Sequence, residues 1–124
     1  MSKTTDATVD EDGWLDLPCP VAVKTGLILA CPPSWLAAGK AQILDHHALI
    51  AINRRIARLR TSGMMPMVTT LKTIYRTHAV LCRHDPKGNR VELPPRVRAA
   101  FSPLPAPVTI TPEDGHLTLR ATPR

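Results

Sequence analysis

The sequence has few aromatic residues, and this limits how its core can be built. Only 3% of the 124 residues are aromatic: Trp14, Trp35, Tyr75 and Phe101. Aromatic side chains usually dominate the burial of a small domain, so here the core must consist mainly of Leu, Ile, Val, Ala and Met. Hydrophobic residues still make up 44% of the chain, which argues against wholesale disorder.

Cysteine is also scarce. Cys19, Cys31 and Cys82 are an odd set that does not suggest a disulfide framework, and reduced thiols are typical of the cytoplasm. The N-terminus is acidic and lacks an early apolar run, so no signal peptide is expected. The longest uncharged run, 25–39, is interrupted by prolines and too short to span a bilayer. We therefore expect a soluble, cytoplasmic protein that has no membrane partner.

Catalytic motifs are missing as well. The sequence contains neither a Gly-x-Ser-x-Gly nucleophile elbow nor a Gly-x-x-x-x-Gly-Lys phosphate loop. Carboxylates for general acid–base catalysis are scarce, because only five acidic residues follow position 16: Asp45, Asp85, Glu92, Glu113 and Asp114. We expect a non-catalytic protein without a cofactor. A small enzyme with Cys82 as its nucleophile, beside His84 and Asp85, is the alternative.

Proline is abundant, in contrast, and it shapes the expected domain organisation. Six of the 13 prolines lie between Pro94 and Pro112. Proline neither continues a helix nor donates to a central sheet ladder, so an extended connector is predicted over 94–112. Residues 1–13 are acidic and show no apolar periodicity, which predicts a flexible tail. The rest, 14–124, is predicted to be one small domain.

The remaining patterns predict an α+β fold. Residues 21–31 are apolar and bounded by prolines, and the Thr-rich segment 68–84 favours a strand over a helix. Turn residues at 85–88 and 111–115 predict two β-hairpins. With no internal repeat apparent, we expect one principal helix packed on a small antiparallel sheet of hairpins.

The principal helix is predicted over 45–60. At about 100° per residue, five apolar side chains fall on one face: Ala48, Leu49, Ile52, Ile56 and Leu59. Asp45 would project from the middle of this face, where a lone carboxylate is costly. We therefore expect Asp45 to be the N-cap residue, accepting hydrogen bonds from backbone N–H groups.

A basic face adjoins the apolar face of this helix. Arg54, Arg55 and Arg58 share an arc of about 100° with His47, whereas Arg60 lies elsewhere. No acid follows Asp45 in the helix, although exposed helices usually intersperse Glu for ion pairing. Guanidinium groups bind carboxylates and phosphates. The pattern predicts binding to an acidic protein surface or a nucleic-acid backbone; a merely solvated face is the alternative.

The basic set extends beyond the helix. If 69–84 is a strand, Lys72 and Arg76 share one of its faces, and we add both to the predicted partner site. The one nearby aromatic, Tyr75, would lie on the opposite face, so phosphate contact is favoured over base stacking. The partner is therefore predicted to be an acidic protein or nucleic acid, and association into a homo-oligomer is a further expectation.

Two other clusters have weaker predictions. His78, Cys82 and His84 would share a strand face, but their spacing matches no standard zinc motif. We expect a buried cysteine and partly buried histidines, and no metal. The methionines that follow the helix, over 64–67, are either core filler or an adaptable contact surface. We favour core filler.

Overall fold

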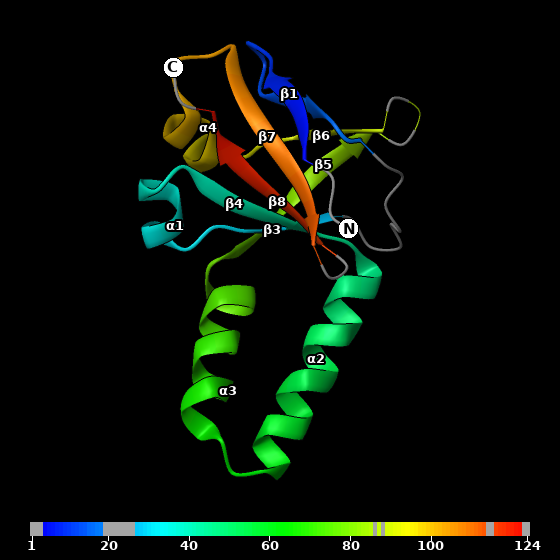
Figure 1. The fold of residues 1–124 in the computed structure, drawn as a ribbon, viewed down its shortest axis with the longest axis vertical. Coiled ribbons are helices and arrows are strands. Elements are labelled where there is room, and N and C mark those ends of the chain that lie inside the picture. The colour runs from blue at the N-terminus through cyan, green and yellow to red at the C-terminus, as the bar shows by residue number, and fades with distance from the viewer. Residues whose placement is uncertain (1–3, 19–26, 86, 88, 114–115, 123–124) are drawn as a thin grey trace.

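The computed structural model describes residues 4–18, 27–85, 87, 89–113 and 116–122. Within them, eight strands form one antiparallel sheet that curves into a nearly closed barrel (Figure 1). The strands are β1 (Thr5–Val9), β2 (Trp14–Asp16), β3 (Leu27–Ala30), β4 (Lys40–Leu44), β5 (Ala79–Asp85), β6 (Arg90–Glu92), β7 (Ala106–Glu113) and β8 (His116–Ala121). The helices are α1 (Pro33–Ala37), α2 (His46–Thr61), α3 (Met65–Lys72), the π-helix η1 (Thr73–Thr77) and α4 (Pro95–Phe101).

The order of the strands explains how the barrel nearly closes. Their order is β1-β7-β8-β4-β3-β5-β6-β2. The two end strands, β1 and β2, follow one another in the chain across a tight turn, in which the Asp10 N–H donates to the Trp14 carbonyl at 3.0 Å. This turn brings the two edges of the sheet together. Few strand edges are then left open for pairing with another chain.

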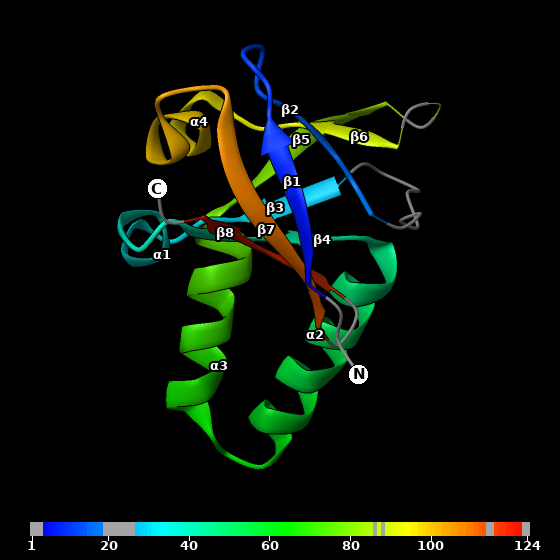
Figure 2. The same cartoon turned by 45° about the horizontal axis from the view of Figure 1, so that its top comes forward.

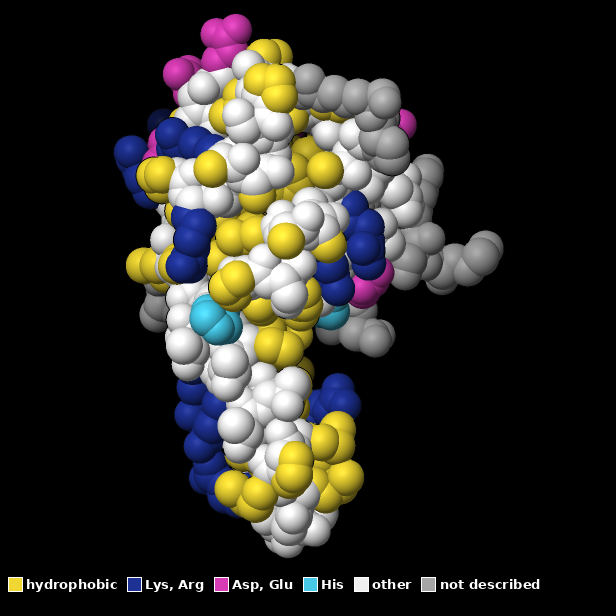
Figure 3. Space-filling model, turned by 90° about the vertical axis from the view of Figure 1, so that its left-hand side faces the viewer, with side chains coloured by type: hydrophobic (Ala, Val, Ile, Leu, Met, Phe, Trp, Pro, Cys, Tyr) yellow, Lys and Arg dark blue, Asp and Glu magenta, His cyan; other side chains and the backbone are white. Residues whose placement is uncertain are grey.

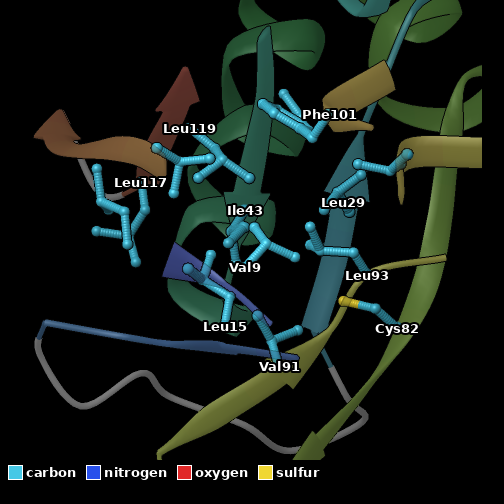
Figure 4. Packing of buried hydrophobic residues seen from close by; sticks show 14 of the residues in the cluster. Val9, Leu15, Leu29, Ile43, Cys82, Val91, Leu93, Phe101, Leu117 and Leu119 are labelled. Atoms are coloured by element: carbon cyan, nitrogen blue, oxygen red, sulfur yellow. The ribbon is translucent and has the colours of Figure 1, made fainter. Parts of the chain in front are cut away.

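The barrel encloses the main hydrophobic core. Side chains from strands of both the N-terminal and the C-terminal part of the chain converge there (Figure 4), and Leu15, Leu29, Ile43 and Leu119 are fully buried. Helix α4 adds Phe101 to the same cluster. Burying a side chain of this size contributes about 1.5–3 kcal/mol, so the aliphatic residues supply a core despite the few aromatics.

The barrel consists of two similar halves. Strands β1 to β4 correspond to β5 to β8 in that order, and exchanging the halves reproduces the strand order once β1 and β2, at the two ends of the sheet, are counted as neighbours. Two antiparallel pairings lie on the pseudo-twofold axis: β2–β6 is centred on Leu15↔Val91, and β4–β8 on Gln42↔Thr118. Both central pairs are separated by 76 residues in the chain. One rotation therefore relates both halves.

Backbone hydrogen bonds follow the same symmetry. The Leu17 N–H donates to the Asn89 carbonyl at 2.9 Å, and the Leu93 N–H donates to the Gly13 carbonyl at 2.8 Å. The sequence repeats only faintly, as Leu-Asp-Leu-Pro over 15–18 and Val-Glu-Leu-Pro over 91–94. The expectation of no internal repeat is therefore wrong. The matching segments are too short and too altered to stand out in a single sequence.

The expected fold of one principal helix on a small sheet is also wrong. The chain forms an eight-stranded barrel-like sheet with four α-helices, although it is a small single α+β domain as expected. Residues 5–9, placed in the acidic tail, form β1 and pair with β7. Pairing from Thr5↔Ile110 to Val9↔Ala106 satisfies their backbone groups and buries Val9, which a tail without apolar periodicity does not predict.

The predicted proline-rich connector is mostly regular structure. Residues 95–101 form α4, and β7 begins at Ala106. Proline is tolerated in the first turn of a helix, where its missing N–H has no intrahelical partner. Pro95 begins α4 in this way, as Pro33 begins α1. The β5–β6 and β7–β8 hairpins are confirmed. Of the strand predicted over 21–31, residues 27–30 form β3, and 21–26 lie outside the described residues.

A helical hairpin of residues 46–77, which we call the arm, joins the two halves. Helix α2 runs outward and α3 with η1 returns, so the arm extends away from the barrel (Figures 1 and 2). The strand predicted over 68–84 is therefore helical as far as Thr77. The hydroxyls of Thr70 and Thr73 donate to carbonyls four residues earlier, and Val68 is buried. Tertiary packing overrides the strand propensity of this segment.

Candidate functional site

The arm begins at a defined cap. Asp45 has an extended backbone, and its Oδ1 accepts a hydrogen bond from the Ala48 N–H at 2.9 Å. The predicted N-cap is confirmed. Because Asp45 directly follows β4, the cap starts α2 at the end of a strand whose last residue, Leu44, is fully buried.

The base of the arm packs on the outer face of the barrel. Leu44 and Ala48 are buried there, with Ile52 and Ile74 packed against them. The Tyr75 hydroxyl donates to Gln42 Oε1 of β4 at 3.0 Å. Both the outgoing and the returning helix are therefore anchored to the barrel at one strand.

The net charge of the protein lies entirely on the arm. Of its 16 Lys and Arg, six lie within 46–77, a segment without Asp or Glu. The other ten are balanced by the ten acidic residues of the chain. The formal charge of +6 is therefore the charge of the arm, and the remainder of the chain is neutral.

Three cations of the barrel have carboxylate partners, whereas the cations of the arm have none among the described residues. Arg90 pairs with Asp10 at 2.7 Å, and Glu92 lies 3.7 Å from Arg83 and 3.5 Å from Arg98. In the part of the chain that the structure describes, no carboxylate forms an ion pair with an Arg or Lys of the arm. Ion pairs among the described residues therefore do not neutralise the positive potential of the arm.

The predicted basic face of α2 divides in two. Arg54, Arg58 and His47 are exposed. Arg55 is also exposed, but it lines a pocket with Tyr75 between the two helices. Figure 3 shows Lys and Arg side chains along one edge of the arm and hydrophobic side chains at its end. Arg54 and Arg58 are thus the arginines of this set that lie outside the pocket lining.

Lys72 and Arg76 do not share a strand face, because their segment is helical. Lys72 is the last residue of α3 and half-buried, whereas Arg76 is exposed in η1. The Arg76 Nη2 donates to Asn53 Oδ1 of α2 at 3.3 Å. Arg76 therefore lies beside α2 and adds its charge to that helix. This position results from the helical hairpin and not from the predicted strand.

The end of the arm exposes three methionines. Met64, Met65 and Met67 are 46%, 49% and 39% exposed, so the expectation that they fill the core is wrong. The turn between the helices lies far from the barrel (Figure 1), and the nearby buried side chains are Ile56 and Val68. Gly63, at a φ of +76°, and Pro66 were the sequence signals of this turn.

Cys82, the central residue of the alternative site with His78 and His84, is buried. The Cys82 Sγ lies 3.4 Å from the Leu27 carbonyl oxygen, and burial raises the pKa of this thiol to about 12. A thiol with so high a pKa is rarely the reactive thiolate near neutral pH. Across the described residues, no three His, Cys, Asp or Glu side chains are grouped so as to hold a metal ion. Cys19 lies outside the described residues.

The arm also differs from a membrane-spanning hairpin. Its longer helix, α2, has 16 residues and carries four arginines. No helix among the described residues has the length and apolar character needed to cross a membrane.

The chain matches no protein-family model and no curated protein sequence.

Proposed function

We propose that this is a non-catalytic docking protein whose arm binds an acidic surface of a partner protein, as an accessory or regulatory component of an assembly. The observation that carries this proposal is the unneutralised charge of +6 on residues 46–77. A concentrated charge steers an oppositely charged partner and sets its orientation. The arm projects from the barrel (Figures 1 and 2), so a partner has access to it from more than one side.

The composition of the arm favours a protein as that partner. Methionine and arginine are enriched in protein interfaces, whereas lysine is depleted. The arm carries four arginines on α2 and exposes Met64, Met65 and Met67 at its end. Methionine is flexible and packs against surfaces of varied shape. Arginine pairing with carboxylates, followed by burial of the methionines, is the proposed mechanism.

Nucleic acid is the second candidate partner. The acid-free, cationic arm favours it, because guanidinium groups also bind backbone phosphates. Base stacking has little support, since Tyr75 is the one aromatic residue of the arm and its hydroxyl is bonded to Gln42. The exposed methionines have no role in phosphate contact, and for this reason we place the acidic protein first.

A capture experiment with matched variants distinguishes these partners. The full chain is used as bait in native lysate, with and without nuclease. Arg54→Ala/Arg58→Ala removes two charges from the arm, and Met64→Ser/Met65→Ser/Met67→Ser removes its apolar end. Arg83→Ala/Lys87→Ala is the control, because it removes two exposed charges from β5 and the β5–β6 turn instead.

The proposal predicts capture that survives nuclease, is retained by the control, and is lost in both arm variants. Binding weakens with added salt, because exposed charges are screened. Capture that disappears with nuclease would support the nucleic-acid alternative. Capture that is unchanged in both arm variants would contradict any role of the arm in docking.

A cytoplasmic location stays a prediction from the scarce cysteines.

A further inference from the structure

A pocket at the base of the arm has no part in the docking function. It has a volume of about 190 Å³ and lies between α2, the returning helix and the start of β8. Its walls are mainly apolar and include Ala48, Ile52 and Leu71. Three polar side chains, Arg55, Tyr75 and His116, complete its lining. An apolar pocket with a few convergent polar groups is the usual form of a small-molecule site.

Among the polar groups of the pocket, Arg55 contributes a positive charge. No carboxylate among the described residues pairs with Arg55. Burial raises the pKa of the Tyr75 phenol, and the charge of Arg55 opposes that rise. The guanidinium of Arg55 is therefore close enough to Tyr75 to interact with it electrostatically. In the part of the chain that the structure describes, the buried His116 Nε2 has no hydrogen-bond partner, and it lies 3.6 Å from Glu113 Oε2.

The backbone beside the pocket is unusual. Residues 73–77 form a π-helix, closed by the His78 N–H donating to the Thr73 carbonyl at 3.0 Å. Such turns are rare and occur frequently at functional sites. Here the π-helix contains Tyr75, which both lines the pocket and bonds to Gln42. Tyr75, which lies in this irregular turn, therefore has two roles: it lines the pocket and it anchors the arm to the barrel.

We propose that this pocket binds a small organic monocarboxylate, whose charged group pairs with Arg55 and whose apolar body contacts Ile52 and Leu71. A guanidinium–carboxylate contact is a charge-assisted hydrogen bond, which is shorter and stronger than a neutral one and is frequently bidentate. The volume of about 190 Å³ lies below the roughly 300 Å³ at which drug-sized sites begin, so the pocket favours a small ligand. An acid with a single ring, such as benzoate, has a suitable size.

The bound acid would connect the arm to the barrel, because α2, the returning helix and β8 all line the pocket. Ligand that binds only the folded protein also stabilises it. The pocket would therefore fix the angle of the arm whichever macromolecule the arm holds. This inference stands independently of the docking proposal.

The test is a titration of the ¹⁵N-labelled full chain, followed by amide NMR shifts. Benzoate is the probe, benzamide is the neutral ligand of the same shape, and acetate supplies the charge without the ring. Arg55→Met removes the pocket charge, and Arg54→Met removes the neighbouring exposed charge as the matched control. Leu71→Trp fills the pocket and leaves Arg55 in place.

We expect saturable benzoate shifts at Ala48, Ala51, Ile52 and Leu71, with a Kd on the order of 1 mM or lower. Arg55→Met should weaken binding about tenfold or more, Leu71→Trp should abolish it, and Arg54→Met should leave it unchanged. Equal binding of benzamide, equal effects of the two arginine variants, retained binding in Leu71→Trp, or no saturation would each overturn the proposal.

Discussion

The Tyr75 hydroxyl donates a hydrogen bond to the Oε1 atom of Gln42 at 3.0 Å, and this contact joins the arm to the barrel. Gln42 is buried on β4, directly opposite Thr118 on the pseudo-twofold axis. Tyr75 belongs to the returning helix, whereas α2 leaves the barrel from the same strand. The direction of the arm is thus determined at both of its ends.

Tyr75→Phe should lower the free energy of unfolding by about 1–2 kcal/mol, because the buried Gln42 carboxamide loses its donor. Urea denaturation followed by circular dichroism measures the change. Thr70→Val is the control: it removes an exposed hydroxyl bond in the same arm and should change stability by less than about 0.5 kcal/mol. An unchanged urea midpoint in Tyr75→Phe would show that the contact does not stabilise the fold.

Asp45→Ala should destabilise the protein by about 1 kcal/mol, because α2 loses its N-cap acceptor. Asp45→Asn retains a capping oxygen, so its stability should stay close to that of the wild type. Thermal unfolding of the three proteins distinguishes them. A loss in Asp45→Asn as large as that in Asp45→Ala would mean that charge, rather than capping, is the contribution of Asp45.

Asp10 should give the fold a specific sensitivity to acid. The Trp14 N–H, with further help from the Asp12 N–H and Arg90, lowers the pKa of this carboxyl, and burial only partly opposes the change. A carboxyl whose pKa is lowered in the folded state stabilises the fold at pH values above its ordinary pKa of 3.8. That stability is lost as the pH falls through the folded pKa.

Urea midpoints measured at a series of pH values below the ordinary pKa test this expectation. The wild type should lose stability faster than Asp10→Asn as the pH falls, because the variant has no proton to bind at this site. Parallel curves for the two proteins would show that Asp10 does not link folding to protonation.

Cys82 should resist alkylation while the protein is folded. Its pKa of about 12 leaves about one thiolate in ten thousand at pH 8, and the side chain is only 7% exposed. Mass spectrometry of the peptide containing Cys82, after iodoacetamide treatment, should show modification only when urea is present. Rapid labelling of the native protein would instead revive the nucleophile hypothesis.

Local features of the fold were predictable from the sequence. The Asp45 cap followed from its position on an apolar face, and the β7–β8 hairpin from its turn residues. The basic face of α2 followed from helical periodicity, although Arg55 lies at a pocket rather than beside Arg54 on the open surface. Each of these depends on residues that are close in the chain.

Long-range features were not predictable in the same way. The pairing of Leu15 with Val91 depends on strands 76 residues apart, and only the folded chain shows that the two halves are related. The segment 68–77 became helical because it packs against α2, against its own strand propensity. The exposed methionines at the end of the arm are a consequence of that helix.

The central claim is that the end of the arm contacts an acidic partner protein, and site-specific crosslinking tests it most directly. A photoreactive residue is placed at Met65 and, as the control, at Arg83 on the barrel. We expect a discrete, nuclease-resistant protein adduct from position 65 alone, lost when Arg54→Ala/Arg58→Ala is added. The same adduct from position 83, or an adduct unaffected by loss of the two arginines, would contradict it.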